Sequence, residues 1–217
     1  MKHYILAGAA ALGLAAPAAA QEASVNADLT GPRIEARAGY DLVELNASYD
    51  DGVDSFDGSE STGGVGYGGE IGFDLAAGGA IIGAYAGIED STTDYCTEVF
   101  GGDEACLKAG RNITIGARAG IQTSARGMLY VKGGYSNGRL KATYEDPSSP
   151  TDNLSAGTNL DGFHVGAGGE VGFGSNAYAK LEYVYTKYDG GSYEDEDFGV
   201  GADLERHQLL LGVGIRF

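Results

Sequence analysis

The sequence predicts an all-β fold, an eight-stranded antiparallel up-and-down transmembrane β-barrel. Three observations support it: eight runs alternate apolar with small or charged residues, short turns alternate with long polar connections, and an export signal precedes them. The final run, residues 209–217, shows the pattern most clearly. Its lipid-compatible face comprises Leu209, Leu211, Val213, Ile215 and Phe217, and its other face comprises Leu210, Gly212, Gly214 and Arg216.

Residues 1–20 have the features of a secretory signal peptide. Lys2 supplies the positive end, residues 4–15 form the apolar stretch, and Pro17-Ala-Ala-Ala20 is a cleavage site of the A-x-A type. We therefore expect one outer-membrane β-barrel domain, residues 21–217, after cleavage. No later run approaches ~18 consecutive apolar residues, so no transmembrane helix is expected.

The first four predicted strands cover residues 32–48, 62–75, 80–89 and 107–123. Each places an isoleucine on the lipid-facing side, namely Ile34, Ile71, Ile82 and Ile113. Three of them place a charged residue on the opposite side, namely Arg37, Glu70 and Arg118. The third strand has the weakest alternation. The first loses its alternation at residues 43–45, where we expect a β-bulge.

The last four predicted strands cover residues 128–140, 159–173, 177–188 and 203–217. Their lipid-facing sides include Val131, Val165, Leu181 and Leu211. Their inward sides include Lys132, Glu170, Lys180, Glu182 and Arg206. The same alternation thus defines a lipid-facing and an inward side in all eight runs.

The connections between these strands are of two kinds that alternate along the chain. The short ones are residues 76–79, 124–127 and 174–176, and the long, polar ones are residues 49–61, 90–106, 141–158 and 189–202. Short periplasmic turns and long extracellular loops are the arrangement of an even-stranded outer-membrane barrel. Both ends of the barrel domain then lie on the short-turn side.

The inward positions predict a neutralised ionic core. Residues 65–73 and 165–173 match at seven of nine positions, and each places a glutamate, Glu70 or Glu170, among glycines. The inward bases are Arg33, Arg37, Arg118, Lys132, Lys180, Arg206 and Arg216, and the inward acids are Glu35, Asp41, Glu70, Glu170 and Glu182. An eight-stranded barrel is narrow enough to be filled by its own side chains. We therefore predict a plugged lumen rather than a wide pore.

The two cysteines, Cys96 and Cys106, lie close together in a polar segment. In an exported protein such a pair predicts a disulfide in preference to a metal or redox site. The chain has 14 basic and 31 acidic residues, a formal net charge of −17, which argues against nucleic acid as a partner.

The strands also resemble a known family, the small outer-membrane β-barrels that include opacity-type porin-family proteins and the barrel domain of outer-membrane protein A. Residues 31–40 look like its first strand, residues 182–185 like its seventh and residues 206–217 like its last. Phe217 looks like the family's assembly signal, which implies insertion by the outer-membrane barrel assembly machinery. The resemblance implies a bacterial outer-membrane location, with lipid and lipopolysaccharide as the surroundings.

Three hypotheses about function follow. The preferred one is an integral structural or surface protein with acidic extracellular loops, which serves envelope integrity or contact with an unknown external partner. The alternative is a narrow porin-like channel. A lipid A-modifying enzyme is less favoured: His164 faces the lumen where it could approach Ser136, with Asp161 nearby, whereas His207 faces lipid.

Two further motifs favour ordinary structural roles. The acidic runs at residues 50–57 and 194–197 are read as solvated loop segments, with weak bridging by divalent cations as the minority interpretation. Residues 64–69 fit G-x-G-x-x-G, but no helix follows to form a dinucleotide site. We expect no cofactor, no resident metal and no catalytic residue.

Overall fold

The computed structural model describes residues 29–50, 55–98, 103–145, 154–189, 192–195 and 198–217. The predicted signal peptide lies outside these residues. The described residues form the strands β1 (Gly31–Asp50), β2 (Ser55–Ala77), β3 (Ala80–Ser91), β4 (Asp94–Glu98), β5 (Glu104–Ser124), β6 (Gly127–Glu145), β7 (Leu154–Phe173), β8 (Ala177–Tyr188), β9 (Ser192–Asp195) and β10 (Phe198–Arg216). No helix in the described part of the chain has the length and apolar character needed to cross a membrane.

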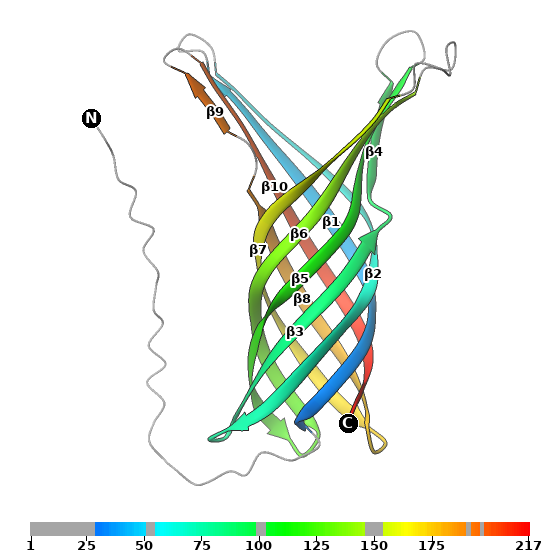
Figure 1. Cartoon of the computed structure of the whole chain (residues 1–217), viewed down its shortest axis with the longest axis vertical. Coiled ribbons are helices and arrows are strands. Elements are labelled where there is room, and N and C mark those ends of the chain that lie inside the picture. Colours follow the sequence, from blue (N-terminus) through cyan, green and yellow to red (C-terminus); the bar gives the residue numbers. More distant parts are fainter. Residues whose placement is uncertain (1–28, 51–54, 99–102, 146–153, 190–191, 196–197) are drawn as a thin grey trace, which may run out of the picture.

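All the strands belong to one antiparallel sheet (Figure 1). Each long strand pairs with the next long strand along the chain, and β1 also pairs with β10, from Arg33 opposite Arg216 to Asp50 opposite Gly199. The pairings of β1, β2, β3, β5, β6, β7, β8 and β10 therefore run in a ring. The short strands β4 and β9 pair with β5 and β10. The predicted all-β antiparallel architecture is confirmed.

The two faces of the ring differ in polarity, as the alternation predicts. Large apolar side chains on the outer face are about half exposed, including Ile71 at 59% and Val131 at 60%. The inner face buries charged side chains. Phe217 is 72% exposed, and its backbone N–H donates to the Pro32 carbonyl at 2.9 Å, which holds the end of the chain against the start of β1.

Short turns close one end of the ring, which we call the turn end. Gly78 and Gly79 connect β2 to β3 with φ angles of 57° and 89°, the left-handed backbone that a two-residue type I′ hairpin turn requires. Residues 125–126 and 174–176 form the other two turns. All three turns lie within or overlap the predicted short connections.

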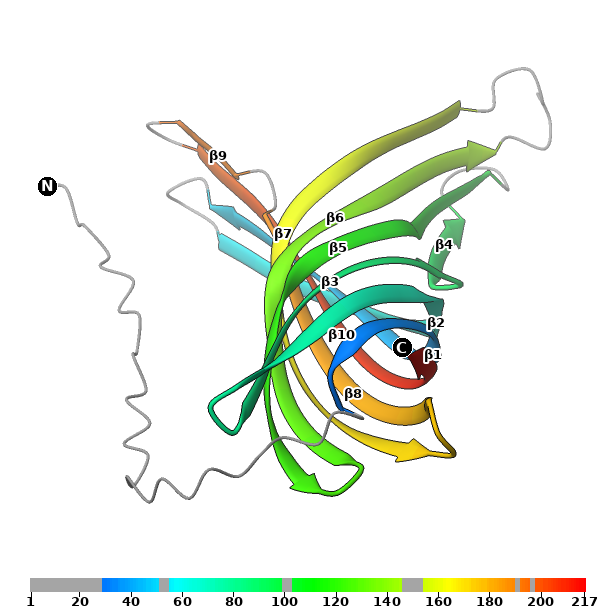
Figure 2. The ribbon, with the colours of Figure 1, turned by 60° about the horizontal axis from the view of Figure 1, so that its bottom comes forward.

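The predicted long connections are largely strand rather than irregular loop. β1 and β2 remain paired to Asp50 and Ser55, and β6 and β7 remain paired to Tyr144 and Leu154. These extensions diverge at the other end of the ring, the arm end, into two arms (Figures 1 and 2). The first arm contains parts of β1, β2, β9 and β10, and the second contains parts of β4, β5, β6 and β7.

The β-bulge predicted at residues 43–45 is wrong. β1 pairs without interruption with both β2 and β10, and Val43 is buried on the inner face. The irregularity at this level lies instead in β5, between Ala109 and Asn112. Gly110 and Arg111 there oppose a single residue of β6, Arg139, so the bulge exchanges the faces to which alternate β5 residues belong.

The apparent loss of alternation in β1 has a different cause: the two faces of the ring exchange polarity toward the arm end. On the inner face, Val43 and Leu45 follow the buried Asp41. On the outer face, Glu44 lies directly opposite Glu205. The alternation continues, but its apolar side now faces inward.

Interior tyrosines occupy the space that glycines leave on the neighbouring strand. Tyr85 lies opposite Gly116, Tyr130 opposite Gly168, and Tyr178 opposite Gly214. A Cβ atom added at any of these three glycines would meet the ring of its tyrosine. This complementarity fills the interior with large side chains.

We expect Gly214→Ala to destabilise the protein by about 1 to 3 kcal/mol, because the new methyl group collides with the fully buried Tyr178 ring. The matched control is Gly169→Ala, whose new Cβ would have its nearest neighbour, a Leu129 methyl carbon, at 3.3 Å. Urea unfolding followed by circular dichroism measures both. Equal stability of the two variants would contradict the packing argument.

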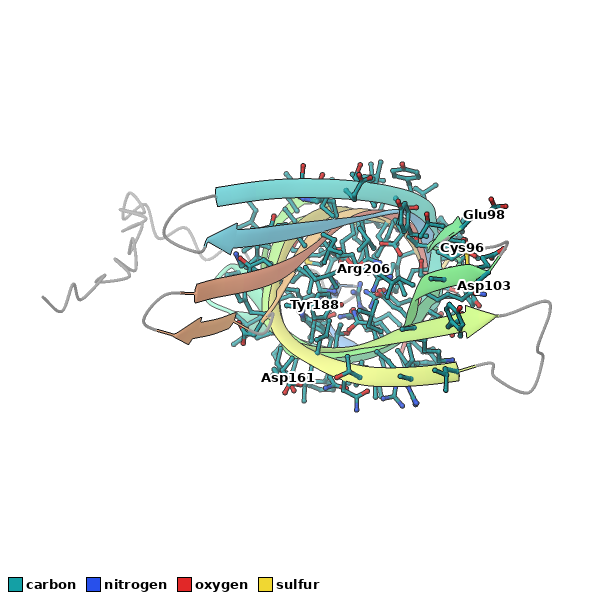
Figure 3. The ribbon with its side chains drawn as sticks, turned by 90° about the horizontal axis from the view of Figure 1, so that it is seen from above. Cys96, Glu98, Asp103, Asp161, Tyr188 and Arg206 are labelled. Carbon is teal, nitrogen blue, oxygen red and sulfur yellow. A yellow bond between two sulfur atoms is a disulfide. The ribbon has the colours of Figure 1, made fainter. Side chains whose placement is uncertain are left out.

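The predicted disulfide between Cys96 and Cys106 is present and joins β4 to β5. The two cysteines are directly opposite each other in the pairing of β4 with β5. Figure 3 labels Cys96 in the second arm. The bond closes a loop with a sequence separation of 10, so it restricts the segment between β4 and β5 and not the ring. By the chain-entropy model, closing a loop of this length stabilises the folded hairpin by about 2 to 3 kcal/mol.

Replacing both cysteines with serine should leave the urea midpoint of the ring unchanged, because the bond spans only one hairpin. Proteolytic cleavage between β4 and β5 should become at least tenfold faster, since the open state of the hairpin gains the entropy that the bond removes. Mass spectrometry of limited digests locates the cuts. A lowered midpoint without new cuts at this hairpin would refute this assignment.

Candidate functional site

The inner face of the ring holds a charge-balanced ionic core. Among the described residues, seven basic and seven acidic side chains are buried there. The bases are Arg33, Arg37, Arg118, Lys132, Lys180, Arg206 and Arg216, and the acids are Glu35, Asp41, Glu70, Asp74, Glu89, Glu170 and Glu182. We call these fourteen residues the ionic core. They come from every long strand of the ring, so their contacts depend on the register of the whole sheet.

The layer nearest the turn end is organised by Asp74 and Glu170. The Arg118 guanidinium donates to Asp74 with Nε at 2.8 Å and Nη2 at 2.5 Å. Arg216 Nη1 lies 2.6 Å from Glu170 Oε1 and Nη2 donates to Asp74 Oδ2 at 3.1 Å. Two arginines from different strands therefore share two carboxylates, as the forked guanidinium geometry allows.

The middle layer is organised by Glu70 and Glu182. Glu70 accepts from Arg33 Nη2 at 2.7 Å, Arg37 Nη1 at 2.8 Å and Lys132 Nζ at 2.7 Å. Glu182 accepts from Tyr130 Oη at 2.7 Å, and it contacts Lys132, Arg37 and Lys180 at 3.1 to 3.3 Å. Lys132 and Arg37 thus join the two carboxylates across the interior.

The layer nearest the arm end consists of Asp41, Arg206 and Glu89. Arg206 forms a bidentate pair with Asp41, with Nε at 2.7 Å and Nη2 at 2.8 Å. Glu89 lies 2.7 Å from Arg37 Nη2 and accepts from Gln208 at 3.3 Å. Figure 3 shows Arg206 and Tyr188 pointing into the ring when it is viewed from the arm end.

The buried charges of the core are stabilised because each carboxylate is held by close cationic partners. Removing an ion from water costs several kcal/mol, and only close, hydrogen-bonded partners offset that cost. Six of the seven carboxylates contact two or more cations, and Asp41 has a bidentate arginine. The core is therefore neutral and multiply cross-linked.

His164 is part of this packed interior. It is 2% exposed, its Nε2 pairs with the Tyr85 hydroxyl at 2.5 Å, and its Nδ1 pairs with the Ser136 hydroxyl at 2.8 Å. The Ser136–His164 contact considered from the sequence thus exists, but Asp161 does not complete it. Asp161 lies on the outer side of the ring, where Tyr135 and Asn137 donate to it.

His207 lies on the outer face at the arm end. Its Nδ1 pairs with the Tyr183 hydroxyl at 2.7 Å, and the Tyr185 ring is 5.1 Å away. Together with Glu44 and Glu205 it forms one of two groups in the described residues with metal-ligand spacing. The other group is Cys96, Glu104 and Cys106, whose two sulfurs are already joined to each other.

Comparison with known proteins decides the family. The family model described as the outer membrane protein beta-barrel domain matches residues 6–217. The chain belongs to this family. It is a bacterial outer-membrane protein, which confirms both the resemblance and the location inferred from the sequence.

Two kinds of relative accompany the family match. A 22 kDa outer membrane protein of Rhizobium leguminosarum bv. viciae is 28% identical over 154 residues, which span 70% of this chain and 67% of the relative. The outer membrane protease OmpT from Escherichia coli has 10% identity and a TM-score of 0.50, covering 86% of this chain and 97% of that one. Neisserial surface protein A has 13% identity and a TM-score of 0.46, covering 87% and 98%. The likeness to OmpT shows the fold alone.

The inward charges predicted from the sequence did not include two residues of the ionic core, Asp74 and Glu89. Asp74 follows Glu70 and Gly72 at inward spacing in β2, and Glu89 follows the lipid-facing Ile88 in β3. Extending the alternation by one step in each strand finds both. The described structure brings all eight residues named for the lumen (Arg37, Glu70, Arg118, Lys132, Glu170, Lys180, Glu182 and Arg206) into the ionic core.

Proposed function

We propose that the eight long strands form a closed barrel with a sealed lumen, and that the protein acts as a structural element of the outer membrane that holds acidic arms at the cell surface. The observation that carries the proposal is the neutral ionic core. A sealed, cross-linked interior makes a rigid support, and it leaves the arms as the part that meets the surroundings.

The packing of the core supports sealing. The cavity between the middle layer and the layer nearest the arm end is lined by Arg37, Glu89, Lys132 and His164, and its volume is about 10 Å³. A single water molecule needs a cavity of roughly 10 to 15 Å³ by this kind of measure. This cavity is therefore too small to hold a hydrated ion, which supports the proposed seal.

The charge distribution supports a surface role. Because the ionic core is neutral, the formal net charge of −17 belongs to the rest of the chain. Acidic arms would repel the anionic lipopolysaccharide surface unless divalent cations lie between them. We propose that the arms contact lipopolysaccharide through such cations, or contact an external partner.

Current measurements in planar lipid bilayers test the proposal. The purified protein should insert and show no steady current at moderate voltage, because the proposed seal would leave no continuous water path. Insertion is checked independently by protease protection of the ring in the same lipid. Reproducible single-channel steps from inserted protein would overturn the sealed-lumen proposal and favour the narrow channel.

A further inference from the structure

The mouth of the ring contains an apolar cavity directly beyond the ionic core. Its volume is about 140 Å³, and its lining comes from both arms and from the strands between them. Apolar side chains make up most of the wall, including Val43, Leu45, Leu107, Ala109, Leu140, Leu160 and Leu204. We call this cavity the mouth cavity. An apolar recess with a few polar groups is the usual form of a small-molecule site, which makes the mouth cavity a candidate binding site.

Two features of the fold build the mouth cavity. The uninterrupted β1 brings Val43 and Leu45 inward, in line with Asp41. The bulge in β5 reverses its alternation, so Leu107 and Ala109 face inward although Asn112, an odd number of residues away, also faces inward. Without that extra residue, the inner face of β5 would be polar at this level.

The floor of the mouth cavity carries an unpartnered amide. Asn112 is 1% exposed, and it lines both the mouth cavity and the small cavity below it. Neither its Nδ2 nor its Oδ1 has a hydrogen-bond partner among the described residues. A buried amide with neither bond made costs free energy, so a group that donates and accepts at this position would be stabilised.

The other polar groups of the floor are already satisfied. Arg206 makes its bidentate pair with Asp41, and Thr93 donates to Asp41 at 3.4 Å. The other charged residues of the lining, Glu60 and Arg139, are solvent-exposed. A charged ligand group would therefore find no buried, unpaired counter-ion at the floor, and the acidic arms would disfavour an anion. The site suits a neutral head group.

We propose that the mouth cavity binds a small neutral molecule of the phenol class, with an apolar ring against the leucines and a hydroxyl on Asn112. The hydroxyl donates to Asn112 Oδ1 and accepts from Nδ2. The size follows from the volume, because an apolar protein cavity of about 150 Å³ holds a benzene-sized molecule. A lipid acyl chain is too large for this space.

Fluorine NMR tests the proposal with two ligands of nearly equal size. The protein in lipid nanodiscs is titrated with 4-fluorophenol and with 4-fluorotoluene, and protein-free nanodiscs report partition into lipid. Saturable binding above that background is expected for both, with 4-fluorophenol bound about threefold to tenfold more tightly because of the hydroxyl. Identical titrations with and without protein would overturn the proposal.

Variants separate the cavity wall from its floor. Ala109→Trp fills the mouth cavity and should abolish binding of both ligands, and Leu160→Asn keeps the size of the side chain and should weaken both. Asn112→Leu should remove the preference for 4-fluorophenol while 4-fluorotoluene still binds. Lys141→Ala, which changes an exposed residue of the second arm, is the matched control and should bind like the unchanged protein.

Two further outcomes, from the variants, would refute the proposal. Binding that survives in both Ala109→Trp and Leu160→Asn would place the ligands elsewhere, for instance at the lipid boundary. A preference for 4-fluorophenol that persists in Asn112→Leu would remove the assigned hydroxyl partner. Circular dichroism and protease resistance of each variant confirm that the ring is intact before titration.

Discussion

Replacing Glu70 with glutamine should lower the free energy of unfolding by about 3 to 5 kcal/mol, the range for breaking a buried ion pair by removing one partner. The amide has nearly the same shape, so packing is kept. Three cations contact Glu70 within 2.8 Å, namely Arg33, Arg37 and Lys132. In the variant these cations surround a neutral amide. Urea unfolding in lipid vesicles, followed by circular dichroism, measures the loss.

Two further variants show whether charge is the cause. Adding Lys132→Met to Glu70→Gln restores the charge balance and should recover part of the loss, because one uncompensated cation is gone. Lys187→Met breaks contacts to Asp203 and Glu205 at the exposed rim, at 3.3 and 3.5 Å, and should cost less than about 1 kcal/mol. A Glu70→Gln protein as stable as the Lys187→Met protein would contradict the role assigned to the ionic core.

Removing the middle layer without changing the net charge should open the lumen. The variant carries Arg37→Ala, Glu70→Ala, Lys132→Ala and Glu182→Ala, which removes two cations and two anions. These four side chains link the two central carboxylates across the interior. Their loss leaves space that water fills, so planar bilayers should show steady current steps where the unchanged protein shows none.

The control for this experiment is a charge-neutral deletion at the rim, Lys187→Ala with Asp203→Ala, which should stay silent because the pair lies outside the lumen. Circular dichroism and protease resistance establish that both variants are folded. If the folded four-residue variant conducts no current, the middle layer is not what closes the lumen, and the seal must lie elsewhere in the interior.

The sequence predicts the strands and the inward residues for a simple physical reason. Adjacent residues of a strand face lipid and the narrow interior in turn, and the two surroundings favour apolar and polar side chains respectively. The residue types at Glu70 and Ile71 therefore predict which side each faces, even when their contact partners are unknown. The partners themselves were not predictable. Glu70 meets Lys132 from β6 only because the pairings of the intervening strands fix their relative heights.

The arms and the mouth cavity were not predicted because apolar side chains no longer face outward where the strands extend beyond the membrane. Beyond Asp41 the alternation continues with its apolar side inward, and a reading that expects apolar residues to face lipid mistakes this for a bulge at Val43. The true bulge, at Gly110 and Arg111, leaves little trace in the sequence. Pairing with β6, rather than local preference, determines it.

Cancellation of charge inside the ring has a consequence for copies that share a membrane. With seven cations matched to seven anions within, the net negative charge of every copy, −17 for the whole sequence, lies outside the ionic core, where neighbouring copies meet it. Lateral spacing between copies should therefore respond to electrolyte, contracting as the Debye length falls from about 30 Å at 0.01 M to about 10 Å at 0.1 M. Dilute media should disperse the protein across the bilayer, and concentrated media should let it crowd.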